Sequence, residues 1–290
     1  MRTFSKFFLF FAIFSIVLTL SSCKNGNENN VNNDVVIDTD SLNIQEKINQ
    51  AKEIFYSLPA PHEVAMFLIQ NDDTYFDQEL LNTVDHSMTY TTEASQAYNL
   101  GVYSADLSYA SLFDQNQIVI NYMATSKKLA EELGILEAFD QETIKALEEN
   151  VNNRDEVMRI ISESFMDSDA YLQENQRHEI GAMILIGGWV EGVYIAVKLS
   201  DGDPNSNIPL ASSILEQQLS LELMVQFLND FNSGNSQLAT MKTDLTELYD
   251  VYNSLETNVT NDGYLTVSKA EFLKVCEKIE ALRSKIVKLS

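Results

Sequence analysis

The stretch that decides the fold runs from Glu179 to Leu199 and reads EIGAMILIGGWVEGVYIAVKL. Three structures compete for it. A transmembrane helix needs about 20 apolar residues, but Glu191 lies well inside the run, where a carboxylate costs roughly 2.5–3.5 kcal/mol. A buried strand pair would show alternation and a turn, and neither is present. We therefore expect a helix that is covered on most sides at the centre of a helical bundle.

Glycines mark one face of this predicted helix. Gly181, Gly188 and Gly192 are separated by seven and then four residues, so they lie near the same side. Each costs about 1 kcal/mol of helix propensity relative to alanine, so a compensating gain is needed. We expect that gain to be the close approach of another helix. The alternative is room for a small ligand beside Gly188 and Gly192.

Two acidic residues lie in apolar surroundings. A buried Glu191 needs a partner or a proton, and a tyrosine, amide or cation on a neighbouring helix would supply a structural one. Asp106 lies in the similar stretch GVYSADLSYASLF, with Tyr103 and Tyr109 three residues to either side. If the two acids converge, they form a two-carboxylate pocket suited to sugar or amine binding, or to hydrolysis. The candidate ligand-binding residues are therefore Glu191, Asp106, Tyr103, Tyr109, Trp189, Gly188 and Gly192.

The first 22 residues have the pattern of a signal peptide. Arg2 and Lys6 precede an apolar run that ends at Leu20. The sequence Leu20-Ser21-Ser22-Cys23 then resembles the lipobox of bacterial lipoproteins. That resemblance implies cleavage before Cys23, lipidation of its thiol and acylation of its new amino group. Two or more acyl chains give stable membrane anchoring. An ordinary secreted protein with a chance cysteine is the alternative.

Residues 23–40 are rich in Asn and Asp and have no helical period, which predicts a flexible tether ahead of a helical domain at 41–290. With the lipobox, this composition is similar to that of helical lipoproteins of Bacteroidota. The resemblance implies a lipid-anchored protein of the cell envelope, at the outer membrane rather than the inner one. Asp40-Ser41-Leu42 also fits the loose O-glycosylation pattern of that group.

Charge and motifs exclude several function classes. The formal net charge is −24, and loss of Arg2 and Lys6 with the signal would make it two units more negative. Such a chain repels phosphate backbones, which argues against nucleic-acid binding, and it should not lie flat on anionic lipid. The sequence contains no P-loop, dinucleotide fingerprint or G-x-S-x-G motif, so we expect no cofactor. His62, His86 and His178 form no metal-binding pair.

The single remaining cysteine, Cys276, leaves no partner for a disulfide once Cys23 is lipidated, and we expect it to be a small core residue.

Helical periodicity recurs along the chain and predicts an all-α fold, an irregular bundle of roughly nine helices. The expected helices lie near residues 44–58, 91–113, 117–133, 142–150, 157–172, 179–199, 210–231, 238–255 and 272–289. Pro59 and Pro61 end the first, and Gly134 closes the third.

The last two helices carry apolar residues at alternating spacings of three and four, which predicts an antiparallel coiled-coil-like hairpin over 235–290. It either packs on the body or projects as an arm that binds a partner. The segment that joins its helices imitates a calcium loop, but Lys269 stands where the last acidic ligand should be. Residues 201–207 read as a turn, with a weak cation site as the alternative.

These patterns favour a membrane-tethered binding or scaffold protein that is not an enzyme, with a protein partner or a small ligand. The alternatives are a hydrolase that uses Asp106 and Glu191, and a sensor with a ligand pocket at the glycine-rich helix.

Overall fold

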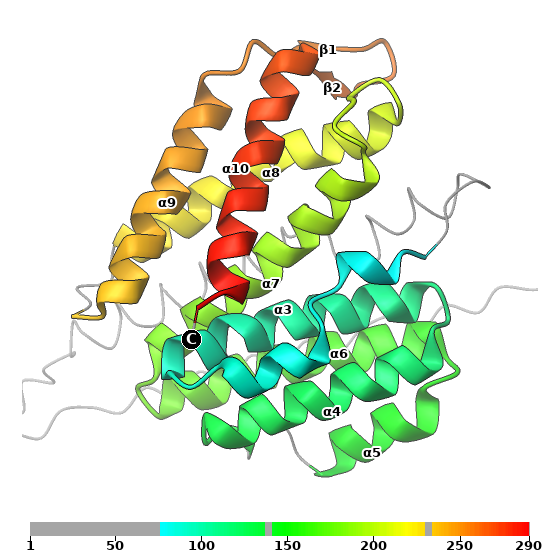
Figure 1. Cartoon of the computed structure of the whole chain (residues 1–290), viewed down its shortest axis with the longest axis vertical. Coiled ribbons are helices and arrows are strands. Elements are labelled where there is room, and N and C mark those ends of the chain that lie inside the picture. The colour runs from blue at the N-terminus through cyan, green and yellow to red at the C-terminus, as the bar shows by residue number, and fades with distance from the viewer. Residues whose placement is uncertain (1–75, 137–140, 230–233, 290) are drawn as a thin grey trace, which may run out of the picture. The chain divides into compact units, whose positions relative to one another are not determined.

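The computed structural model describes residues 76–136, 141–229 and 234–289, which all belong to one compact unit. The predicted signal, the tether, Cys23, the helix at 44–58 and His62 lie outside the described residues. Within them the all-α prediction is confirmed: eight α-helices are joined by two short 3-10 helices and one small sheet. The elements are η1 (Gln78–Leu80), η2 (Val84–Thr89), α3 (Glu93–Leu112), α4 (Asn116–Glu132), α5 (Gln141–Asn150), α6 (Arg154–Glu174), α7 (His178–Leu199), α8 (Ile208–Asn229), α9 (Ser236–Asn253), β1 (Asn258–Val259), β2 (Leu265–Thr266) and α10 (Lys269–Val287) (Figure 1).

Local sequence signals set several helix ends. Thr92 and Ser95 form a reciprocal capping box at the start of α3, and Ser268 and Glu271 form another at α10. Gly134 follows α4 with a φ of +66°, a conformation that glycine adopts without steric cost, so its predicted role at this helix end is confirmed.

Helix α7 is the predicted central helix. It packs against α3, α6, α8 and α10, and most of its side chains are buried. Among the described residues it is the one helix long and apolar enough to cross a membrane, but 72% of that apolar window is buried inside the protein. Its uniform apolarity therefore matches a helix covered by neighbours on most sides.

Glycines let α3 and α7 approach closely. A Cβ atom at Gly187 would overlap the carbonyl oxygen of Tyr98, and one at Gly101 would overlap that of Ile184. A Cβ atom at Gly188 would lie 3.5 Å from the Gly101 oxygen, an ordinary contact. Gly188 therefore lies at the contact between α3 and α7, as expected, and Gly187 and Gly101 lie there too. The prediction was wrong for Gly192, because no atom of a neighbouring segment lies within 4 Å of the place where its Cβ atom would be.

The C-terminal hairpin packs on the body. Helices α9 and α10 lie side by side, joined through the small sheet (Figure 1). Their apolar seams are buried, and α10 also packs on α7 while α9 packs on α8. The joining segment contains a feature that was not predicted, an antiparallel pairing of Asn258 with Thr266 and of Val259 with Leu265. The hairpin is thus an integral part of the domain.

Candidate functional site: a buried carboxyl pair

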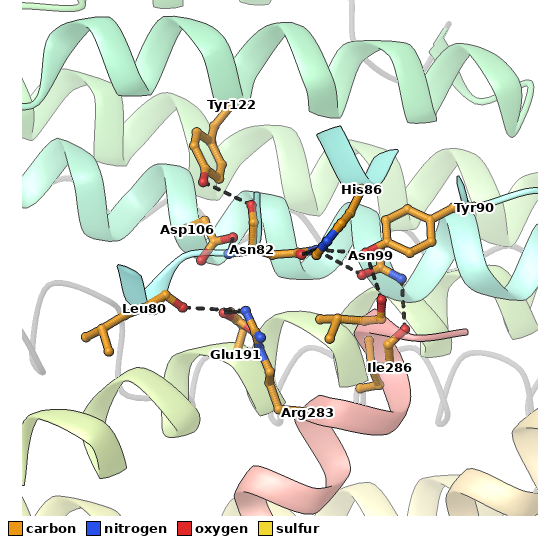
Figure 2. Close-up of polar contacts among 11 residues, drawn as sticks. Leu80, Asn82, His86, Tyr90, Asn99, Asp106, Tyr122, Glu191, Arg283 and Ile286 are labelled. Carbon is orange, nitrogen blue, oxygen red and sulfur yellow. Dashed lines mark hydrogen bonds and ion pairs between the residues drawn. The ribbon is translucent and has the colours of Figure 1, made fainter. Parts of the chain in front are cut away.

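The candidate site lies where four segments meet. We call residues 77–90 the strap; they contain η1 and η2 and precede α3. Figure 2 shows strap residues Leu80, Asn82 and His86 close to Asp106 of α3, Glu191 of α7 and Arg283 of α10. The two carboxyl side chains come from the helices that the glycines bring into close contact. Packing of α3 on α7 therefore places both acids in the core.

Glu191 is paired with Arg283. The guanidinium Nε donates to Oε2 at 3.0 Å, and Nη2 donates to Oε1 at 3.1 Å. The Glu191 side chain is fully buried, and that of Arg283 is 15% exposed. Such a two-point contact is the strong form of a carboxylate–arginine pair. Both oxygens of Glu191 are therefore held by an ionic partner from the last helix.

Arg283 has two further contacts. Its Nη2 donates to the carbonyl oxygen of Leu80 at 3.4 Å, and its guanidinium carbon lies 4.6 Å from the ring centroid of Tyr194. The ring attracts the cation, and the strap carbonyl uses one of its remaining donors. Burial lowers the pKa of Arg283, but Glu191, followed by Tyr194 and then Asp106, raises it above its ordinary value. Arg283 is therefore charged at every physiological pH.

Asp106 is fully buried, which favours the protonated form of its carboxyl group. Its Oδ2 accepts the backbone N–H of Asn82 at 3.1 Å, whereas its buried Oδ1 accepts no hydrogen bond from the described residues, and Glu191 is near enough to affect its pKa. Burial, followed by the neighbouring Glu191 carboxylate, raises the pKa of Asp106 well above its ordinary value. Burial also raises the pKa of Glu191, although Arg283 and, to a smaller extent, the Asp106 side chain oppose it. Because Glu191 has the arginine and Asp106 does not, a proton bound by the pair favours Asp106.

Asn82 connects the strap to the rest of the cluster. Its carbonyl oxygen accepts from the Tyr122 hydroxyl at 2.9 Å, and its Nδ2 donates to the Tyr90 hydroxyl at 3.0 Å and to Asn99 Oδ1 at 3.3 Å. His86 Nδ1 lies 2.9 Å from Asn82 Oδ1. Every polar group of this buried asparagine is thereby used. Neither Asn82 nor Arg283 was predicted from the sequence.

The last turn of α10 is tied to the same cluster. Asn99 donates to the carbonyl oxygen of Ile286 at 3.1 Å, and the Tyr90 hydroxyl donates to that of Val287 at 3.2 Å (Figure 2). These bonds use carbonyl groups that a helix end leaves without intrahelical partners. The start of α3 and the end of the strap therefore cap the C-terminal helix.

The structure brings together only part of the predicted residue set. Asp106 and Glu191 are close enough to affect each other's pKa, and Tyr103 is close enough that Asp106 contributes to raising its pKa, after burial and Tyr90. The Tyr103 hydroxyl, however, donates to the Thr83 carbonyl at 2.9 Å. Tyr109 accepts the N–H of Asp77 and stacks on Phe76. Both tyrosines thus hold the strap.

Trp189 and the two glycines have other roles. The indole N–H of Trp189 donates to Gln217 of α8 at 3.0 Å, within the core. Gly188 packs on α3, and Gly192 adjoins open space. Their placement on the same helix as Glu191 therefore does not make them part of one pocket.

The geometry limits the chemistry of the acid pair. Both carboxyl side chains are 0% exposed, and Glu191 is bonded at both oxygens. A hydrolase needs its acid and its base in contact with substrate. As folded, the cluster neutralises its own charges and joins chain segments. Among the described residues, no group of three or more His, Cys, Asp or Glu side chains is arranged to hold a metal ion.

Comparison with protein-family models, with curated proteins and with solved structures finds no match to this chain.

Proposed function

We propose that this protein is an exported lipoprotein of the cell envelope, anchored by lipid on Cys23, whose helical domain binds a partner without catalysing a reaction. The anchor rests on the Leu20-Ser21-Ser22-Cys23 motif, and the tether on the Asn-rich composition that follows. In this proposal the protein belongs with the helical lipoproteins of Bacteroidota that its sequence resembles.

One observation carries the non-catalytic part of the proposal. The candidate catalytic acids, Asp106 and Glu191, are both fully buried. Glu191 is also in an ion pair with Arg283. Its hydrogen bonds go to the chain itself, as in a structural network. The domain is therefore better suited to present a surface than to bind a substrate between these acids.

Charge indicates the kind of partner. With a formal charge of −24 before processing, the chain repels nucleic acids and anionic lipid headgroups. A tether of about 17 residues reaches several nanometres when extended, so it holds the body away from the bilayer. We propose a protein partner in the envelope that is neutral or basic at the contact.

Two experiments test the proposal. Metabolic labelling with a fatty-acid analogue should label the wild-type chain and leave Cys23→Ala unlabelled. Crosslinking in intact cells should then recover a reproducible protein partner with the wild type, and much less of it with Cys23→Ala, which is released from the membrane. An unlabelled wild type would refute the anchor. Crosslinking no stronger than that of an unrelated lipoprotein would refute the binding role.

A small-ligand sensor is the second candidate, because a Cβ atom at Gly192 would meet open space. Gly192→Ala should then weaken binding of the ligand while leaving the fold intact.

A further inference from the structure

The strap closes over an acid pair whose net charge depends on one proton. With Asp106 protonated, Glu191 and Arg283 cancel, and the buried cluster is neutral. Without that proton, two carboxylates face one guanidinium, and a net negative charge lies where both side chains are 0% exposed. Burying an uncompensated charge is strongly unfavourable. The closed arrangement is therefore stable only when the acid pair carries one proton.

The strap contacts the cluster at two nearby points that belong to different helices. The Asn82 N–H bonds Asp106 of α3, and the Leu80 carbonyl accepts from Arg283 of α10. The strap is formed of two short 3-10 helices, whereas the acids lie on α-helices of 20 and 22 residues. Short 3-10 segments have poorer hydrogen-bond geometry than α-helices. The strap is thus the least regular of the segments that contact the two acids.

We propose that the strap is a proton-dependent lid: it stays closed while Asp106 and Glu191 share a proton, and it opens to admit water when that proton leaves. Opening replaces the Asn82 N–H with water at Asp106 and hydrates the new charge. This inference concerns the folded domain and is independent of the proposed anchor and partner.

The other titratable groups around Asp106 do not account for the same switch. Tyr103 of α3, Tyr122 of α4, Tyr194 of α7 and Tyr90 at the end of the strap face the cluster, and burial raises the pKa of each phenol. Because these shifts are upward from an ordinary pKa of about 10, the four phenols remain neutral up to at least about pH 9. Arg283 of α10 remains charged. His86, which bonds the Asn82 side chain, requires its own control.

The sign of the effect follows from the direction of the shift. The pKa of Asp106 is higher with the strap closed than in water, where an aspartate has a pKa of about 3.9. The closed state therefore binds more protons than the open one between these two values. Closure is fully favoured below the ordinary pKa and weakens as pH rises through the raised one. Within that window one proton changes the opening equilibrium by about tenfold per pH unit.

Two neutral hydrogen bonds also favour the closed strap, and their strength does not change with pH. Tyr122 donates to the Asn82 carbonyl, and Tyr103 donates to that of Thr83. Neither bond depends on the Asp106 proton. Rising pH should therefore increase the frequency of opening without unfolding the domain.

Amide hydrogen exchange on the full chain tests the lid directly. Exchange of the strap amides, corrected for the intrinsic effect of pH, is measured from about pH 4 to about pH 9. In the wild type the strap's opening constant should rise by about tenfold per pH unit within the window, while α4 changes little. Asp106→Asn keeps an acceptor for the Asn82 N–H and has a side chain that cannot ionise. Its strap exchange should change by less than about twofold over the same range.

His86→Gln is the matched control and should keep the wild-type dependence. Infrared spectroscopy of the wild type supplies a measurement that needs no variant, because a protonated carboxyl band should be present while the lid is closed and should decline together with strap protection. The proposal is overturned if Asp106→Asn retains the wild-type dependence, if His86→Gln abolishes it, or if strap and α4 amides lose protection equally. Absence of the carboxyl band in the wild type would also overturn it.

Discussion

Arg283 on the last helix bonds both carboxylate oxygens of Glu191 on the central helix, at 3.0 and 3.1 Å, across 92 residues of sequence. The pair links the C-terminal hairpin to the core, and Asp106 and the strap extend the link to α3. Breaking a buried pair by removing one partner is far more costly than never having the pair, because the remaining charge is left in the core. The cluster therefore makes the packing of four segments interdependent.

Replacing Arg283 with methionine should destabilise the domain by about 3–5 kcal/mol, since the buried Glu191 would either keep a charge without its cation or have to bind a proton. Urea unfolding followed by the fluorescence of Trp189 measures the loss. The control is Lys278→Met on the same helix, which removes an exposed pair with Glu247 and should remain close to wild type. Adding Glu191→Gln to Arg283→Met removes the stranded charge and should recover part of the loss. A double variant no more stable than Arg283→Met would contradict this account.

Much of the fold could be predicted because its signals are periodic. The apolar run at 179–199 has no polar face, which predicts a covered helix, and α7 is that helix. The alternating spacings of three and four near the C-terminus predict paired seams, and α9 and α10 bury them. In both cases a pattern within one segment determines which side of the helix is buried.

The site could be predicted only in part, for a physical reason. Acids within apolar runs are conspicuous, so Asp106 and Glu191 were identified. Their partners are not conspicuous: Asn82 lies in an irregular segment, and Arg283 lies among the many charged residues of α10. A buried carboxylate requires a cation, and Arg283 is the only arginine after Arg177, which was the one signal that could have pointed to it. The Asn82–Asp106 bond joins residues 24 apart in the sequence, and the Arg283–Glu191 pair joins residues 92 apart. Contacts between segments so far apart leave no periodic pattern in the sequence.

Two glycines of α7 should respond to alanine in opposite directions. Gly187→Ala places a methyl group against the Tyr98 carbonyl, so α3 and α7 must separate at a cost of about 1–3 kcal/mol. Gly192→Ala meets open space and should stabilise the helix by about 0.5–1 kcal/mol. Denaturant midpoints of the two variants measure the contrast. Equal destabilisation by both variants would show that α3 does not pack on the Gly187 side of α7.

The hydrogen bond between Trp189 and Gln217 should contribute measurably to the free energy of unfolding, although it is a single contact. Gln217→Leu keeps the bulk of the side chain but leaves the buried indole N–H without its acceptor, which should cost about 1–3 kcal/mol. It should also shift the fluorescence emission of the folded state to shorter wavelength, since the indole loses a polar partner. Gln226→Leu on the same helix is the control: that residue is exposed and should change stability by less than about 0.5 kcal/mol. Unchanged emission in Gln217→Leu would contradict the placement.

Thiol labelling can examine the core and the proposed anchor together. Burial raises the pKa of the Cys276 thiol to about 11, so at about pH 8 little of it is the reactive thiolate. Iodoacetamide should modify Cys276 at least about a hundredfold more slowly in the folded protein than in urea, because burial also restricts access. Mass spectrometry after labelling in urea counts the free thiols. A chain lipidated at Cys23 should accept one label, whereas two labels on protein taken from membranes would mean that Cys23 carries a free thiol and no lipid.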